Sequence, residues 1–204
     1  MDYNEWEPIY KDILKDFSFD QNRDDEAAIL LSKLLKDDAI EDLYALLNGK
    51  DVVICGNAPS LKDEIESLGS EVVVAADGAT SVLLKNGIIP DAIVTDLDGT
   101  IGDLFYANRL GAIMVVHAHG DNIDALKKVV PQLSSVVGTT QSEPFDNIYN
   151  FGGFTDGDRA VFVAKSLSAK DIKLIGFDFD DPDVSEIKRK KLHWAQRLIS
   201  KLLF

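Results

Sequence analysis

From Lys50 onward, short apolar segments rich in β-branched residues alternate with stretches of helical pattern. The apolar segments are nearly continuous, which is typical of strands covered on both faces of a sheet. Helices between such strands imply crossover connections, which join parallel neighbours. We predict strands at Asp51–Cys55, Glu71–Ala75, Ala92–Thr95, Ala112–Val116, Ser135–Val137 and Ile172–Ile175, and helices near 60–68, 79–87, 103–110, 122–130, 157–169 and 184–203. The chain should therefore form a three-layer, Rossmann-like α/β fold, with a mostly parallel sheet of about six strands and helices on both faces.

The first 49 residues have a different pattern, with apolar residues at every third or fourth position. That spacing is typical of amphipathic helices. Pro8 suits the first turn of one helix, and Asp24 or Asp25 could cap the next. We therefore expect an N-terminal helical region, residues 1–49, packed on a main α/β domain, residues 50–204.

Composition excludes several classes of protein. The chain has 204 residues with 35 acidic and 21 basic side chains, a net charge of −14. That charge argues against nucleic-acid partners and against anionic membrane surfaces, because both are polyanions. The single cysteine, Cys55, excludes an intrachain disulfide framework or a thiolate zinc cluster and is interpreted as buried filler. With no apolar stretch long enough to cross a bilayer, a soluble cytoplasmic protein is expected.

Aspartates follow two neighbouring predicted strands. Asp77 comes after the second strand, and Asp96 and Asp98 come two residues apart after the third. In parallel sheets, ligands bind beyond the carboxyl ends of the strands. Carboxylate oxygens there suit Mg²⁺ that is shared with phosphates. Asp-Gly turns without a function are the alternative, but acidic residues at adjacent strand ends favour a site.

The first predicted strand ends in a turn of small residues, Gly56-Asn57-Ala58-Pro59-Ser60. Backbone N–H groups in such a turn suit phosphate. A tight turn in which Ser60 caps the next helix explains the segment equally well.

The fourth predicted strand ends in His117-Ala118-His119-Gly120-Asp121. Two imidazoles two residues apart share a face, so they could bind a metal, contact phosphate or act in acid–base chemistry. A capped loop, with Asp121 as the N-cap of the next helix, is the alternative.

Another polar segment precedes the helix predicted near 157–169. Thr155 and Asp158 fit a capping box, whereas the flanking glycines and phenylalanines suggest a shaped pocket. Asp156 would repel phosphate at a helix start and suits a ligand with paired N–H donors. Asp178 repeats the strand-end pattern after the last strand. The basic run 188–191 is interpreted as a solvated face, with a phosphate-reaching lysine as the alternative.

The strand ends around Asp77, Asp96 and Asp98 resemble the catalytic domain of thiamin pyrophosphokinase, although Thr95 and Gly99 replace a glycine and a serine of that pattern. Nearly the whole chain resembles the archaeal 6-hydroxymethyl-7,8-dihydropterin diphosphokinase family. That resemblance is carried by Trp6, Pro8 and Tyr10, by Gly56-Asn57-Ala58-Pro59-Ser60-Leu61, by His117-Ala118-His119-Gly120-Asp121-Asn122, by Gly153-Phe154-Thr155-Asp156-Gly157-Asp158-Arg159, and by Gly176-Phe177-Asp178.

This resemblance implies Mg²⁺-dependent transfer of diphosphate from ATP to a reduced hydroxymethylpterin, with release of AMP. The candidate residues are Asp96, Asp98 and His119 for catalysis; Gly56, Asn57, Ala58, Pro59 and Ser60 for the nucleotide; Thr155, Asp156 and Asp178 for the pterin; and Asp77, Asp96, Asp98 and Asp121 for the metal. Folate and methanopterin pathways both remain open, and related folds are compatible with a homodimer. The alternatives are a thiamin pyrophosphokinase, a metal-dependent hydrolase built on His117 and His119, and a non-catalytic nucleotide-binding protein.

Overall fold

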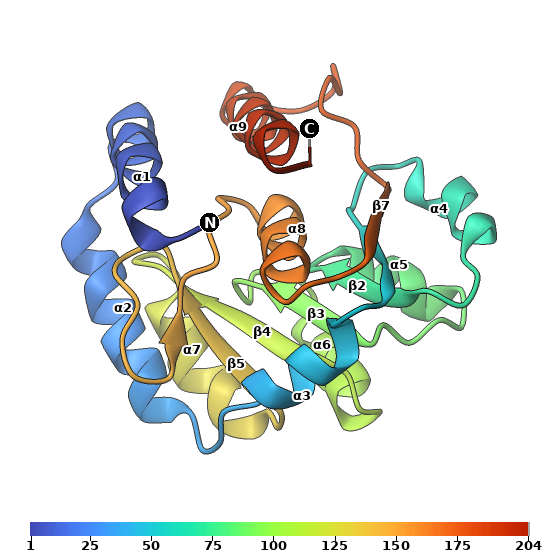
Figure 1. Cartoon of the computed structure of the whole chain (residues 1–204), viewed down its shortest axis with the longest axis horizontal. Coiled ribbons are helices and arrows are strands. Elements are labelled where there is room, and N and C mark those ends of the chain that lie inside the picture. Colours follow the sequence, from blue (N-terminus) through green and yellow to red (C-terminus); the bar gives the residue numbers. More distant parts are fainter. Residues whose placement is uncertain (204) are drawn as a thin grey trace.

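A computed structural model describes residues 1–203 (Figure 1). Its helices are α1 (Tyr3–Phe17), α2 (Gln21–Leu34), α3 (Ile40–Leu47), α4 (Leu61–Glu64), α5 (Ala79–Lys85), α6 (Ile101–Arg109), α7 (Ile123–Val129), α8 (Asp156–Ser166) and α9 (Glu186–Leu203), with single 3₁₀ turns η1 (Ile65–Ser67) and η2 (Val130–Gln132). Its strands are β1 (Asp51–Cys55), β2 (Val72–Ala76), β3 (Ala92–Thr95), β4 (Ile113–Ala118), β5 (Val136–Thr140), β6 (Ile148–Tyr149) and β7 (Asp171–Ile175).

The strands form one sheet in the order β6-β5-β4-β3-β2-β1-β7, and every pair in it is parallel. The predicted α/β class with a parallel sheet is confirmed. The prediction of about six strands missed β6, a two-residue strand that pairs with β5. Two residues do not make an apolar run, so hydropathy could not find this strand.

The chain crosses the sheet in one direction from β1 to β6 and then returns. Helix α8 lies across the strands and leads to β7, which pairs with the free edge of β1 (Figure 1). The order therefore reverses between β1 and β7, the place where sheets of this kind leave a crevice for ligands. Gly56 and Gly176 follow these two strands, and an added Cβ on Gly56 would lie 2.5 Å from the carbonyl oxygen of Gly176. The segments that follow β1 and β7 approach each other so closely here that both positions require glycine.

Two apolar cores lie on opposite faces of the sheet. One buries residues of α2, α4, α5, α6 and α7, including Leu31, Leu83 and Leu104, against one face. The other buries α3, α8 and part of α9, including Leu43 and Val161, against the second face. The three layers follow directly from alternation along each strand, since neighbouring side chains such as Val53 and Ile54 enter different cores.

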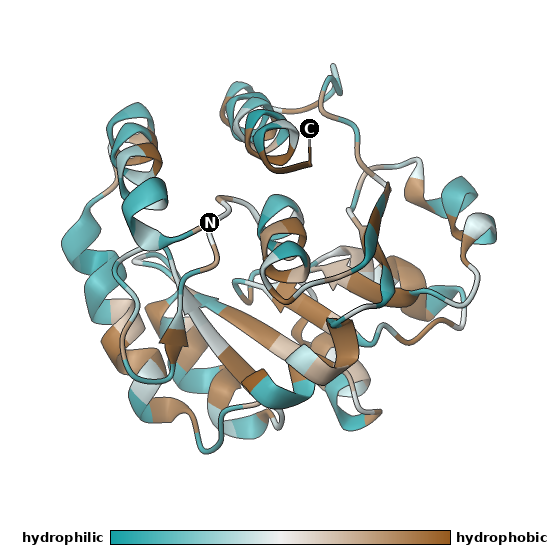
Figure 2. Cartoon of the chain, in the orientation of Figure 1, coloured by the Kyte–Doolittle hydropathy of each residue, from teal (hydrophilic) through white to brown (hydrophobic). Residues whose placement is uncertain are grey.

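A third cluster joins α1 to α8 and α9. Trp6, Tyr10 and Ile13 of α1 are fully buried against Phe162 of α8 and Leu198 of α9. The outward faces of α1 and α9 are hydrophilic (Figure 2). Helices α2 and α3 of the predicted N-terminal region also contribute to the two sheet cores. The division into residues 1–49 and 50–204 stays a prediction.

Two details of the N-terminal helices differ from the sequence expectation. Helix α1 begins at Tyr3, capped by Asp2, so Pro8 lies inside the helix and not in its first turn. The cap of α2 is Asp20, and Asp24 is buried within the helix, where it accepts two hydrogen bonds. Runs of aspartate offered several possible caps, and tertiary contacts decide among them. None of the helices within residues 1–203 has the length and apolarity that crossing a bilayer demands.

Candidate active site

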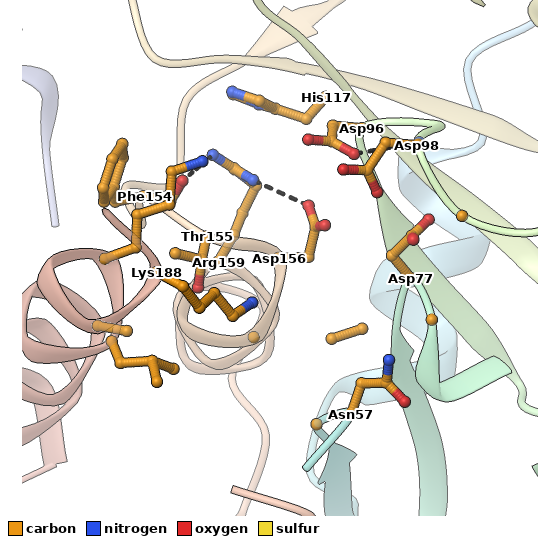
Figure 3. Close-up of a pocket in the computed structure, with 18 of the residues that line it drawn as sticks. Asn57, Asp77, Asp96, Asp98, His117, Phe154, Thr155, Asp156, Arg159 and Lys188 are labelled. Atoms are coloured by element: carbon orange, nitrogen blue, oxygen red, sulfur yellow. Dashed lines mark hydrogen bonds and ion pairs between the residues drawn. The ribbon is translucent and has the colours of Figure 1, made fainter. Parts of the chain in front are cut away.

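A cavity of about 970 Å³ opens at the carboxyl ends of the strands. Its walls come from the segments after β1, β2, β3, β4 and β7, from the start of α8, and from α2 and α9 (Figure 3). Every predicted site residue except Ser60 lines this one cavity. Residues more than 100 positions apart in the chain meet here because parallel strands end at a common edge.

The carboxylates of Asp77, Asp96 and Asp98 lie together on one side of the cavity (Figure 3). One oxygen from each lies within 4.8 Å of the others. The hydroxyl of Thr95 donates to Asp77, which itself has a φ of +31° at the end of β2. A Cβ on Gly99 would contact the carboxylate of Asp77, so the turn after β3 needs a glycine for this group to fit. The strand-end aspartates predicted from the sequence are therefore brought together by the fold.

The charges in this cluster oppose one another. Burial and the charge of Asp98 raise the pKa of Asp77 to about 7. Burial and the charge of Asp96 also raise the pKa of Asp98. For Asp96, burial opposes ionisation, but the hydrogen bond and charge of His119, with the charge of Arg159, lower the pKa overall. Carboxylates that repel at this distance form a donor set into which a divalent cation fits.

The two histidines after β4 have different surroundings. His119 Nε2 lies 3.3 Å from Asp96 Oδ2. His117 is buried, its Nδ1 lies 3.1 Å from the hydroxyl of Thr139, and its Nε2 has no hydrogen-bond partner among residues 1–203. Burial and the charge of Arg159 lower the pKa of His117, so its imidazole is neutral. Within residues 1–203, the cluster with ligand spacing contains only the three aspartates, which gives a two-histidine metal site no support.

The loop that carries His119 is held in place by two neighbours that sequence reasoning missed. Asn122 Nδ2 donates to the carbonyls of Asp96 and His117 at 2.7 Å each, and its Oδ1 accepts from the N–H of His119 at 3.1 Å. Asp24 of α2 accepts from the N–H of Gly120 at 2.8 Å. Asn122, and not Asp121, is the residue that precedes α7, and neither provides a side-chain cap.

The turn after β1 lines the cavity with Gly56, Asn57, Ala58 and Pro59. Ser60 lies outside the lining, and its hydroxyl neither caps α4 nor finds another partner among residues 1–203. The interpretation of Ser60 as a side-chain cap is therefore wrong. Helix α4 has only four residues, and the N–H groups of Gly56 and Ala58 donate to the carbonyls of Ile175 and Gly176 at 2.8 and 2.9 Å, so neither is available to a ligand.

The start of α8 forms the wall facing the aspartates. Thr155 is the N-cap and Asp158 is at N3, as predicted, and the Asp158 carboxylate accepts from the N–H groups of Phe154 and Thr155 at 2.7 Å each. Asp156 accepts from Arg159 Nη1 at 3.2 Å (Figure 3). Burial and the charge of Asp96 raise the pKa of Asp156 well above that of an ordinary carboxyl.

Arg159 is the cation that sequence reasoning did not assign to the site. The residue is 3% exposed, and its guanidinium also donates to the carbonyls of Gly153 and Phe154. Gly153 has a φ of +90°, and an added Cβ would overlap the backbone of Arg159. Gly153 thus allows the loop to pack directly against Arg159. The Gly152-Gly153 pair is the feature of the sequence that could have indicated a tightly packed residue in the following helix.

Asp121 and Asp178 occupy the edge of the cavity. Asp121 is exposed and lies outside the three-aspartate cluster. Asp178 is exposed, and its carboxylate accepts from the N–H of Asp180. Their roles as a metal ligand and a pterin contact stay predictions. Lys188 and Lys191 of α9 also line the cavity, so the basic run is more than a solvated face.

The chain matches known proteins over most of its length. A family profile described as "6-hydroxymethylpterin diphosphokinase MptE-like" matches residues 26–184. Proteins named 6-hydroxymethyl-7,8-dihydropterin pyrophosphokinase are 41% identical in Methanocaldococcus jannaschii, over 99% of this chain and 96% of that protein, and 41% identical in Methanothermobacter thermautotrophicus, over 98% and 94%. A protein of the same name in Pyrococcus furiosus is 44% identical over 98% of this chain and 93% of its own length. With this degree of similarity, the chain belongs to the MptE-like 6-hydroxymethylpterin diphosphokinase family.

Proposed function

We propose that this protein transfers the β,γ-diphosphate of ATP to 6-hydroxymethyl-7,8-dihydropterin in a Mg²⁺-dependent reaction, giving the pterin diphosphate and AMP. The observation that carries the proposal is the meeting of Asp77, Asp96 and Asp98 in a large cavity at the ligand-binding edge of the sheet. Membership of the diphosphokinase family and the names of the relatives support the choice of reaction and acceptor.

Asp77, Asp96 and Asp98 would hold the metal, with Asp121 as an outer contact through water. Three hard oxygen donors suit Mg²⁺, which also keeps waters and phosphate oxygens as ligands. Bound Mg²⁺ would supply charge neutralisation to the triphosphate. The raised pKa values of Asp77 and Asp98 support this assignment, because a cation stabilises the ionised cluster that mutual repulsion otherwise disfavours.

Gly56, Asn57, Ala58 and Pro59, the part of the turn that lines the cavity, would hold the nucleotide. The turn lies where the strand order reverses, the usual place for a ligand. Because Gly56 and Ala58 already donate their N–H groups to backbone carbonyls and Pro59 has none, Asn57 would supply the donors that this turn offers to a phosphate. Asn57 adds an exposed amide group on the cavity side (Figure 3).

Thr155, Asp156 and Asp178 would bind the pterin. A pterin edge carries paired N–H donors, for which carboxylate oxygens are the matching acceptors. Asp156 is fixed by Arg159, so its free oxygen has a defined direction. Burial of this pair supports recognition of a flat polar ring in preference to free phosphate, which Asp156 would repel.

His119 would assist attack by the hydroxymethyl oxygen. That oxygen forms a bond to the β-phosphorus, the bond between the β-phosphorus and the α,β-bridging oxygen breaks, and AMP leaves. The hydroxyl proton would pass to Nδ1 of His119, the ring nitrogen that accepts from the N–H of Asp121, while Nε2–H donates to Asp96, whose charge stabilises the imidazolium. Holding the hydroxymethyl oxygen in line with the bond that breaks would further lower the activation barrier.

The test is direct. Purified protein is incubated with ATP, Mg²⁺ and 6-hydroxymethyl-7,8-dihydropterin, and the products are separated by chromatography and identified by mass. We expect pterin diphosphate and AMP in equal amounts, and a competing thiamin substrate should not be diphosphorylated. Formation of ADP, or no turnover by folded protein, would refute the proposal.

Variants test the metal role. Asp96→Asn and Asp98→Asn should each lower kcat about 100-fold, because each removes a charged ligand. Asp124→Asn is the matched control, since the Asp124 side chain is 87% exposed and lies outside the cavity. Full activity in either cluster variant would remove these carboxylates from the mechanism.

A further inference from the structure

Four consecutive basic residues in α9, Lys188 to Lys191, point in two directions. Lys188 and Lys191 line the cavity together with Leu192 and Ala195. These positions are spaced i, i+3, i+4 and i+7, which places them on one face of a helix. This face of α9 is therefore turned toward the site.

The other two basic residues bind elsewhere. Arg189 donates to the carbonyl of Pro182 at 3.1 Å in the preceding loop. Lys190 donates to the carbonyl of Asp16 at 2.6 Å and lies over the ring of Phe17 at 4.9 Å. Trp194 Nε1 adds a bond of 2.9 Å to the Asp16 carboxylate. Lys190 and Trp194 thus fix α9 against the end of α1.

The ammonium groups of Lys188 and Lys191 are free of such partners. Within residues 1–203, neither makes a side-chain hydrogen bond or an ion pair, and Lys191 only lies 6.0 Å from the centre of the Phe154 ring. The other basic side chains of the lining are committed: Arg23 donates to Gly120, and Arg159 donates to Asp156 and to two carbonyls. The cavity therefore contains two uncommitted cations, both on α9.

The surroundings make these cations significant. Nine aspartates line the part of the cavity formed by residues 1–203, against four lysines and arginines. Figure 3 shows Lys188 extending from α9 toward the side occupied by Asp77. A polyanion entering this space needs positive charge on the side away from the metal, because a metal at the aspartates contacts only some of its oxygens.

We propose that Lys188 and Lys191 of α9 bind the polyphosphate chain of the nucleotide, on the side of the cavity opposite the aspartate cluster. This rests on the proposed function for the identity of the nucleotide. The two lysines are binding residues that neutralise the phosphate oxygens not held by the metal. They bind as point charges, so the contact depends on the phosphates and not on the base.

The test compares charge removal on the two faces of the same helix. Lys188→Ala, Lys191→Ala and the double variant are compared with Arg189→Ala. Arg189 is next to Lys188 and two positions before Lys191, and its replacement removes an equal charge that does not line the cavity. Calorimetry measures binding of Mg·ATP and, separately, of Mg·tripolyphosphate, which has no base or sugar. We expect each single lysine variant to weaken both ligands about tenfold and the double variant more, while Arg189→Ala stays within about twofold.

Kinetics separate the two substrates. In the diphosphokinase assay, Lys191→Ala should raise KM for ATP about tenfold and leave KM for the pterin unchanged, and Lys191→Arg should restore most of the loss. Thermal unfolding checks that the variants fold. We expect them to fold because, within residues 1–203, the side chains of Lys188 and Lys191 make no hydrogen bond that the substitutions would remove. Lysine variants that bind Mg·ATP as tightly as Arg189→Ala would overturn the proposal, as would a rise confined to the pterin KM.

The two proposals fail in different ways. Lysine-dependent binding of Mg·tripolyphosphate without formation of pterin diphosphate would support the lysine assignment and refute the proposed acceptor. Formation of pterin diphosphate with unchanged ATP binding in the double variant would support the reaction and refute the lysine assignment.

Discussion

At the scale of single residues, the aspartate cluster depends on groups that do not touch a substrate. Asn122 joins the ends of β3 and β4 by bonding to the carbonyls of Asp96 and His117 and to the N–H of His119. These three bonds fix the backbone that carries Asp96 and His119, the residues proposed to bind the metal and to accept the proton. A shift of an ångström at this point would misalign both.

Replacement of Asn122 tests that role. Asn122→Ala should lower kcat about 10- to 100-fold and the free energy of unfolding by about 2–3 kcal/mol, since buried backbone groups lose partners. Activity and urea denaturation measure the two effects.

Asn108 provides a matched control at the opposite edge of the sheet. It is equally buried, donates from Nδ2 to the carbonyls of Ala112 and Ser134, and accepts from the N–H of Ser134. Asn108→Ala should lose similar stability and keep its kcat. Equal loss of kcat in both variants would mean that Asn122 acts only on stability.

The same residue scale shows what sequence reasoning can reach. Asp77, Asp96 and Asp98 could be selected from the sequence because ligands bind beyond the carboxyl ends of parallel strands, and this rule needs no knowledge of the tertiary contacts. Arg159 and Asn122 were not, because a single basic or amide residue has the same appearance whether it caps a helix, faces solvent or enters a site. Only the tertiary contacts distinguish these cases.

At the scale of elements, α1 and α2 are linked to the site through one buried carboxyl. Asp24 Oδ2 accepts from the hydroxyl of Tyr10 in α1 at 2.6 Å, and its Oδ1 accepts from the N–H of Gly120 after β4. Trp6 adds a bond from its ring N–H to the carbonyl of Gln141 after β5. The N-terminal helices thus help to position the loops at the carboxyl edge of the sheet.

The raised pKa of Asp24 leads to a pH-dependent prediction. Burial raises this pKa in the folded protein, so the carboxyl favours folding when protonated and that contribution is lost as pH rises above the usual range of a carboxyl. Asp24→Asn keeps an acceptor for Gly120 and a polar partner for Tyr10 without the charge. The variant should therefore gain stability relative to the wild type between pH 4 and pH 8, measured by urea unfolding at each pH.

Asp24→Ala distinguishes the charge from the hydrogen bonds. It leaves two buried donors without a partner and should cost about 2 kcal/mol at every pH. If Asp24→Asn were as destabilised as Asp24→Ala at pH 8, the ionised carboxylate would be required and the predicted sign would be wrong.

The elements themselves were predicted with uneven success, for a physical reason. Strands such as Ala92–Thr95 were placed correctly because both faces are buried and the run is uniformly apolar. Strand β6 and the first turn of α1 were missed, since β6 has two residues and α1 begins among polar ones. Pairing with β5 and a capping box between Asp2 and Glu5 define these ends.

At the scale of the whole molecule, the net charge of −14 and the position of the cavity have to be considered together. Much of the acidic excess lies on exposed helices, but nine aspartates line the described cavity. Such a cavity repels a polyphosphate on its own. We therefore expect a nucleotide to enter only together with a divalent cation, because Lys188 and Lys191 would offset only a small part of that charge.

The metal should therefore control nucleotide binding, and thermal unfolding can measure it. At about 100 times its Kd, Mg·ATP should stabilise the protein by about 2.7 kcal/mol, or about 5–10 °C in Tm for a chain of this size. ATP with EDTA, and Mg²⁺ without ATP, should each give only a small part of that shift. The double variant Asp96→Asn/Asp98→Asn should lose the shift, whereas Asp124→Asn should keep it, since Asp124 lies outside the cavity. A full shift with ATP in EDTA would show that the cavity binds the polyphosphate without a metal. The inference that the acidic lining makes nucleotide binding depend on a divalent cation would then be wrong.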